Sequence, residues 1–92
     1  MDQSNQVALT EIKNKIKEFI KSNFLLGNDS NLKDDDSFLE KGIIDSTGVL
    51  ELVSFLEETF GFKVEDEELV PVNLDSLINV TEYVKRKVSN AG

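Results

Sequence analysis

Asp45 and Ser46 combine residue types that could do chemistry, and they stand directly before an apolar-periodic segment. A serine becomes a nucleophile when a neighbouring base takes its proton, and that base is usually histidine. The chain has no histidine and no cysteine, which excludes the common triads and a thiolate nucleophile. Pairs of carboxylates could act as acid and base, but the acids lie on predicted outer faces and in loops, where solvation is usual. The sequence therefore predicts no catalytic residues and no enzyme.

A structural role for the dipeptide is to begin a helix. Aspartate and serine are favoured N-caps because their side-chain oxygens accept hydrogen bonds from the free N–H groups of the first turn. A glutamate three residues after Ser46 would complete a capping box, but Val49 occupies that position. On its own, the dipeptide favours this structural role over a chemical one.

The run Asp34-Asp35-Asp36 is a second candidate for chemistry, as part of a calcium loop. An EF-hand loop needs acids at alternate positions, a central glycine and a twelfth-position glutamate. The spacing fails when it is read from Asp34, and reading from Asn28 puts Leu32 where an acid belongs. We interpret the run as a solvated loop and predict no metal site.

Helical periodicity accounts for the elements that must position these residues. Apolar residues recur on one face between about residues 7 and 23, namely Leu9, Ile12, Ile16, Phe19 and Ile20. A second helix is predicted from Ser46 to Phe60, with Gly61 as a C-terminal glycine and an apolar stripe of Val49, Leu52, Val53, Leu56 and Phe60. The last helix is predicted to begin near Asn73 or Asp75 and to bury Leu77, Val80, Val84 and Val88.

Two connections complete the chain. The first, from Phe24 to Asp45, is too long for an idle loop in a small domain, and we expect its apolar residues to pack over the core: Phe24, Leu25, Leu26, Phe38, Leu39, Ile43 and Ile44. The second runs from Phe62 to Val72 and has room for a short helical turn at residues 67–70. The pattern predicts an all-α, up-and-down bundle, with a short extra helix as an option.

Composition limits the classes of protein. With 92 residues the chain forms one domain, and it has no apolar run long enough to span a membrane. Residues 28–82 carry 15 acids and three lysines, which argues against nucleic acid as a partner and for basic protein partners, although solubility explains the charge equally well. No secretory signal is visible, so we expect a cytoplasmic protein.

Three stretches together resemble the acyl carrier protein family: GIIDS at 42–46, EL at 51–52 and FLEETFG at 55–61. The resemblance covers about residues 38–84 and implies a small four-helix bundle of acyl-carrier type, with a long first loop and a short third helix. It also implies that Ser46 carries 4′-phosphopantetheine from coenzyme A, and that Asp45 is the adjacent recognition residue. The arm would supply the thiol that the chain lacks, and acyl or aminoacyl groups would travel on it as thioesters.

The resemblance also implies partners. A phosphopantetheinyl transferase would attach the arm, and an acyl- or aminoacyl-activating ligase, a synthase or acyltransferases would use it. We expect these proteins to bind the second helix through Thr47, Leu50, Glu51, Ser54, Glu57 and Glu58. We further expect a monomer, with a flexible extension at residues 1–6, a carrier domain at 7–88 and a tail at 89–92.

Some features depart from the family pattern. Thr47 replaces the usual leucine, and Gly48 follows it, so we expect a more flexible start to the helix and a dedicated carrier rather than the housekeeping one. A second pair, Asp75-Ser76, lacks the following EL and FG context, and we expect it to open the last helix. The alternative function is an unmodified helical adaptor with a carrier-like fold, and the identity of the acyl group stays open.

Overall fold

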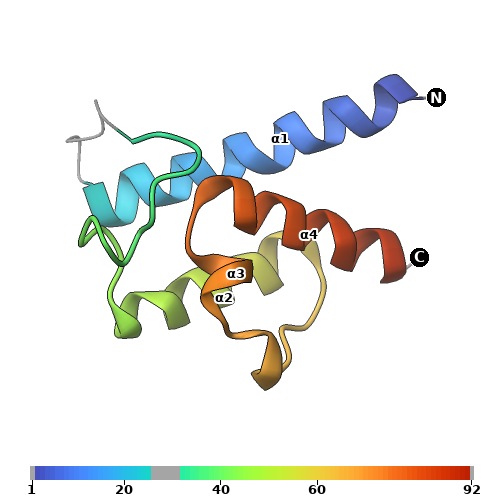
Figure 1. Ribbon diagram of the computed structural model, residues 1–92. Coiled ribbons are helices and arrows are strands. Elements are labelled where there is room, and N and C mark those ends of the chain that lie inside the picture. Colours follow the sequence, from blue (N-terminus) through green and yellow to red (C-terminus); the bar gives the residue numbers. More distant parts are fainter. Residues whose placement is uncertain (1, 26–31, 92) are drawn as a thin grey trace.

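The computed structural model describes the backbone of residues 2–25 and 32–91 (Figure 1). α1 spans Asp2–Ile20 and continues into a π-helical turn at Lys21–Leu25. α2 spans Ser46–Phe60, a 3₁₀ turn spans Asp66–Glu68, α3 spans Pro71–Leu74 and α4 spans Leu77–Ala91. The described residues form no strand, and the predicted all-α fold with four helices is confirmed.

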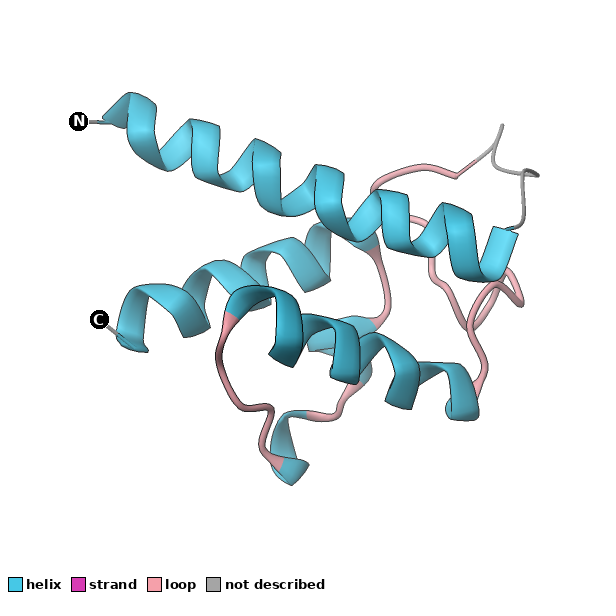
Figure 2. Ribbon diagram, turned by 180° about the vertical axis from the view of Figure 1, so that it is seen from behind, coloured by secondary structure: helices cyan, strands magenta, loops and turns pink. Residues whose placement is uncertain are grey.

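α4 is the helix that holds the others together. It packs against α1, α2 and α3, and it runs antiparallel to α1, so the start of α1 and the end of α4 lie at the same side of the molecule (Figure 1). Seen from behind, the loop that follows α2 leads to α3 (Figure 2). α2 also contacts α1, because the rings of Phe55 and Phe19 stack with their centres 4.2 Å apart. The bundle thus has three long helices and one short one.

The core is apolar and draws on all four α-helices and on the connections that follow α1 and α2. Its buried members are Ile12, Ile16 and Ile20 of α1, Phe38 and Ile44 of the long loop, Leu52 and Leu56 of α2, Val64, Leu74 of α3, and Leu77, Val80, Tyr83 and Val84 of α4. Burying side chains of this size stabilises a fold by about 1.5–3 kcal/mol each. α2 contributes Leu52 and Leu56 as fully buried side chains, and Val49, Val53, Phe55 and Phe60 pack against the core from partly buried positions.

The predicted second helix has the bounds expected from its periodicity, and its end is confirmed. Gly61 has a φ of 76° and donates its N–H to the Glu57 carbonyl at 3.0 Å. This left-handed conformation favours glycine. The bounds of the outer helices differ from the prediction. α1 begins five residues earlier, at Asp2, and α4 begins later, at Leu77.

Gly48 is closely packed at the start of α2, and the expected flexibility of that turn stays a prediction. It is buried, and a Cβ built on it would lie 2.8 Å from Cε1 of Phe24 and 3.0 Å from Cγ2 of Ile44. The glycine therefore allows the π-helical turn and the long loop to approach the first turn of α2 closely. It has a packing role.

The long loop is fastened to the junction between α3 and α4. Phe38 donates its N–H to the Asp75 carbonyl at 2.8 Å, Leu39 donates its own to Asp75 Oδ1 at 3.0 Å, and the Ser37 hydroxyl donates to Asp75 Oδ2. Phe38 and Ile44 reach the core as predicted, whereas Leu39 does not, because it is 49% exposed. Leu26 lies outside the described residues.

The acidic run is only partly solvated. Asp34 Oδ2 pairs with Lys13 Nζ at 2.6 Å, and the Asp34 carbonyl accepts the N–H of Ile78 at 2.9 Å. Asp36 Oδ2 accepts the N–H of Lys33 at 2.9 Å. The run thus ties the loop to α1 and α4, a structural role that the solvated-loop interpretation missed.

Candidate functional site

Asp45, and not Ser46, caps α2. Asp45 has an extended backbone, and its Oδ1 accepts the N–H of Gly48 at 2.7 Å while its carbonyl accepts that of Val49 at 3.0 Å. Ser46 is the first residue of the helix and is exposed. The structural role that the dipeptide suggested therefore belongs to the aspartate alone, which leaves the serine hydroxyl unused for capping.

Ser46 opens onto a shallow cavity of about 300 Å³. Three segments form its wall: the long loop, the first turn of α2, and the stretch that enters α3. The lining residues are Phe38, Leu39, Ile44, Ser46, Val49, Leu50, Leu69, Val70, Pro71, Leu74 and Asp75. Asp75 is the single ionisable side chain among these, so the hydroxyl stands at the edge of a mainly apolar hollow.

The second Asp-Ser pair is structural. Ser76 is only 4% exposed, and its Oγ accepts the N–H of Asn79 at 3.1 Å, so it caps α4. Its neighbour Asp75 holds the long loop through both carboxylate oxygens. Neither side chain of this pair is available to a modifying enzyme in the folded protein.

The residues expected to bind partners divide into two groups. Thr47, Leu50, Glu51, Ser54 and Glu58 are exposed, and Leu50 keeps 59% of its surface accessible. Glu57 is half-buried, because its Oε2 accepts the N–H of Val64 at 2.9 Å. The carboxylate of Glu57 thus fastens the α2–α3 connection to α2, and its expected contact with partners stays a prediction.

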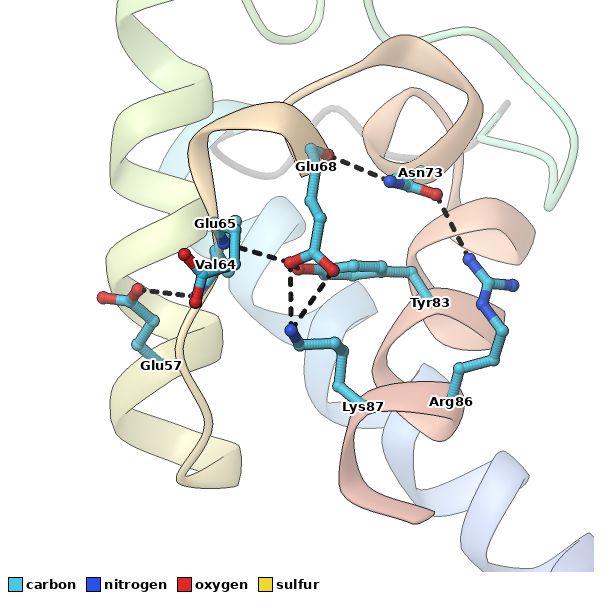
Figure 3. Close-up of polar contacts among 8 residues, drawn as sticks. All are labelled: Glu57, Val64, Glu65, Glu68, Asn73, Tyr83, Arg86 and Lys87. Carbon is cyan, nitrogen blue, oxygen red and sulfur yellow. Dashed lines mark hydrogen bonds and ion pairs between the residues drawn. The ribbon is translucent and has the colours of Figure 1, made fainter. Parts of the chain in front are cut away.

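A polar network below the cavity escaped the sequence analysis. Glu68 Oε1 accepts hydrogen bonds from the Tyr83 hydroxyl at 2.9 Å, Lys87 Nζ at 3.0 Å and the N–H of Glu65 at 3.0 Å (Figure 3). Tyr83 and Lys87 lie one helical turn apart on the same face of α4. This i, i+4 spacing, together with the acidic loop opposite it, was the sequence feature that could have predicted the network.

Two further contacts extend the network. The Glu68 carbonyl accepts the side-chain N–H of Asn73 at 3.0 Å, and Asn73 Oδ1 accepts Arg86 Nη2 at 3.1 Å (Figure 3). Lys87 Nζ also lies 5.9 Å from the centre of the Phe62 ring, within range of a cation–π contact. The stretch between α2 and α3 is therefore held to α4 from both its side chains and its backbone.

The network shifts two pKa values in opposite directions. The N–H of Glu65, the Lys87 ammonium and the Tyr83 hydroxyl together outweigh desolvation and lower the pKa of Glu68 to about 2. Burial and the adjacent Glu68 carboxylate raise the pKa of Tyr83 above its usual value. At neutral pH the carboxylate is thus ionised and the phenol is a hydrogen-bond donor.

The start of α2 fits a phosphodiester on Ser46. The first N–H groups of a helix have no partner within it, and Asp45 engages those of Gly48 and Val49. The N–H groups of Ser46 and Thr47 stand beside the serine hydroxyl, where the positive end of the helix dipole favours an anion. The adjacent cavity has room for part of a flexible arm.

Comparison with known proteins agrees with this geometry. The protein family described as "Phosphopantetheine attachment site" matches residues 9–84. A D-alanyl carrier protein from Abiotrophia defectiva is 34% identical over 55 residues, which cover 60% of this chain and 70% of the relative. No solved structure matches significantly. Within the described ranges, no helix combines the length and the apolar character needed to cross a membrane.

Proposed function

The chain belongs to the phosphopantetheine-attachment family, and on that premise we propose that it carries acyl or aminoacyl groups on a 4′-phosphopantetheine arm attached to Ser46. As a carrier it hands substrates to other enzymes and is not itself an enzyme. When bound, the arm supplies the thiol that holds the cargo as a thioester. The unmodified-adaptor alternative is not favoured.

The exposed hydroxyl of Ser46 at the first residue of α2 is the observation that carries this proposal. Asp45 takes over the capping, so the serine can be esterified without loss of a structural hydrogen bond. The other Asp-Ser serine, Ser76, is buried and caps α4. Burial thus favours Ser46 over Ser76 as the attachment residue.

The residues around Ser46 contribute binding and orientation. The N–H groups of Ser46 and Thr47 would face the phosphate, and the apolar wall that includes Leu50 would contact the arm. Asp45 fixes the first turn and thereby the direction of the serine side chain. Since the chain contains no histidine to activate the hydroxyl, the partner transferase supplies the base.

Membership of the family implies a phosphopantetheinyl transferase and a cargo-activating ligase or synthetase as partners. We propose that they dock on the exposed acids Glu51 and Glu58 and on Leu50, beside the serine. A monomeric state, a cytoplasmic location, and domain limits at residues 6 and 88 stay predictions.

The test is modification in vitro. Wild-type protein incubated with coenzyme A and a phosphopantetheinyl transferase should gain one phosphopantetheine by intact mass, and Ser46→Ala should gain none. Ser76→Ala is the matched control, although its lost cap will lower stability, so its fold is checked first by circular dichroism. Loading of Ser46→Ala would remove the assignment of the attachment residue.

An aminoacyl cargo is the second candidate, because the relative named D-alanyl carrier protein is similar to this chain. We infer that a ligase would attach an amino acid to the thiol of the arm, and D-alanine is the first amino acid to test. Holo protein captured from its native cell and analysed by mass spectrometry should then carry an alanyl thioester. A fatty acyl thioester in that spectrum would exclude this candidate and leave the carrier function intact.

A further inference from the structure

The segment 65–73 lacks apolar anchors, although it forms part of the cavity wall. Between the buried residues Val64 and Leu74, no side chain of the segment is buried. Leu69 and Val70 line the cavity while remaining 38% and 37% exposed. A segment with few buried apolar contacts opens easily unless other interactions hold it.

The interactions that hold the segment come from its half-buried members, Glu68 and Asn73. Glu68 binds Tyr83 and Lys87 through its carboxylate, and Asn73 connects the Glu68 carbonyl to Arg86 (Figure 3). The other hydrogen bonds of this segment join residues within 65–75, so none of them reaches α4 directly. Attachment of the segment to α4 thus depends on these polar contacts.

Glu68 immediately precedes the cavity-lining residues Leu69, Val70 and Pro71. Its carboxylate accepts three donors on one oxygen, and Lys87 Nζ also lies 3.2 Å from the other oxygen, Oε2. The side chains of Lys87 and Glu68 are only 23% and 27% exposed, so solvent screens the pair less than it screens a surface ion pair. Movement of this one residue would displace the wall beside Ser46.

We propose that Glu68 is a positioning residue for the carrier reaction: held by Tyr83 and Lys87, it fixes the Leu69–Pro71 wall beside Ser46 and so prepares the surface on which the transferase docks. Only the docking of the transferase rests on the proposed function; the fixing of the wall by Glu68 does not depend on it. The hydrogen bonds of the Glu68 side chain go to Glu65, Tyr83 and Lys87 and not to α2, so we expect the reacting hydroxyl to keep its position when the wall is released. When the wall is loose, the partner must order it on binding, and this ordering lowers the binding affinity. The chemical step is unchanged.

The experiment compares Glu68→Ala and Glu68→Gln with Glu67→Gln, which changes the same charge on an exposed neighbour. Amide hydrogen exchange is measured on the apo protein. In Glu68→Ala the amides of Leu74 and Asp75 should exchange about tenfold faster or more, and those of Leu52 and Leu56 should change by about twofold or less. Glu67→Gln should match the wild type throughout, and Glu68→Gln, which keeps the neutral hydrogen bonds, should fall between.

Transferase kinetics then separate a positioning role from a merely structural one. For Glu68→Ala the KM for the carrier should rise about three- to tenfold while kcat stays within about twofold. Glu68→Gln and Lys87→Gln should be non-additive when combined, since they remove the same ion pair. Equal exchange rates in Glu68→Ala and Glu67→Gln would overturn the proposal, as would a loosened α3 with an unchanged KM. If wild-type protein is not modified at all, the proposed function fails and the docking role of Glu68 fails with it, whereas the exchange result still decides whether Glu68 holds the wall.

Discussion

Ser46 and Asp45 are adjacent residues with separate duties, and this separation is testable at the residue scale. Asp45 Oδ1 accepts the Gly48 N–H at 2.7 Å, so Asp45→Ala should destabilise the protein by about 1 kcal/mol through loss of the cap. Ser46→Ala removes no capping bond and should change stability by about 0.5 kcal/mol or less. Urea denaturation of both variants measures the difference. A larger loss in Ser46→Ala than in Asp45→Ala would reassign the cap.

The division of labour within the dipeptide could not be read from the sequence. Aspartate and serine are comparably good N-caps, and which one caps depends on where the backbone turns. That turn is set by Ile44, which is buried in the core at 1% exposure, and by Gly48, whose missing side chain admits Phe24. Both constraints come from contacts with residues outside the dipeptide, so the local sequence pattern cannot predict them.

The apolar period of α2 leads to a prediction at the element scale. Leu52 is fully buried, and Leu52→Ala should cost about 2–5 kcal/mol because a small core cannot collapse around the cavity. Glu51 is exposed, and Glu51→Lys should change stability by about 0.5 kcal/mol or less. Phe60 is half-buried, so Phe60→Ala should lower the unfolding free energy by less than Leu52→Ala does. Denaturant midpoints that rank Glu51→Lys as the worst of the three would contradict the orientation of this helix.

Periodicity predicted the position of α2 and the buried face of α1, but it could not predict the bounds of the short helix α3, for a physical reason. Sustained 3.6-residue periodicity placed α2 within its observed bounds, and it placed Ile12, Ile16 and Ile20 on the buried face of α1. α3 has four residues, too few for any period to develop. The start of α4 was ambiguous because Asn73, Asp75 and Ser76 can all cap a helix.

Tertiary contacts resolve that ambiguity in the start of α4. The Asn73 side chain binds the Glu68 carbonyl, and the Asp75 carboxylate binds the long loop at Leu39, 36 residues away in sequence. Ser76 remains, and its hydroxyl accepts the N–H of Asn79. The hydrogen bond from the Val64 N–H to Glu57 was unpredictable for the same kind of reason, because it is set by where Val64 returns to α2, and partner binding by Glu57 stays a prediction.

At the scale of the whole molecule, the Glu68 network predicts a difference in acid stability. The pKa of Glu68 in the folded protein, about 2, lies below the usual value of 4.5. The stabilising contribution of this carboxylate is therefore present above about pH 4.5 and is lost as pH falls towards 2. The difference in unfolding free energy between wild type and Glu68→Gln should therefore be constant above pH 5 and shrink between pH 4.5 and 2. Urea titrations at several pH values measure it. A gap that stays constant down to pH 3 would show that the carboxylate charge contributes nothing.

The acidic surface predicts how partner binding responds to salt. Individual exposed charge pairs contribute about 0–1 kcal/mol, but together they accelerate encounter with a basic partner, an effect lost near 1 M salt, where the Debye length is about 3 Å. Glu51→Gln/Glu58→Gln should load more slowly than wild type at low salt and equally at high salt. Leu50→Ala, which removes an apolar contact, should impair loading at both. Wild-type loading by the double charge variant at low salt would assign the acids to solubility.

The two Asp-Ser pairs have a consequence for valency. In an unfolded chain, Ser46 and Ser76 each follow an aspartate, so an enzyme that recognised only this dipeptide would meet two acceptors. Folding makes one of these acceptors inaccessible, because Ser76 is only 4% exposed and its hydroxyl oxygen accepts the N–H of Asn79. With Ser46 as the proposed attachment residue, we therefore expect one arm for each folded chain. A doubly loaded molecule, detected by intact mass, would therefore indicate that modification had occurred before the chain folded.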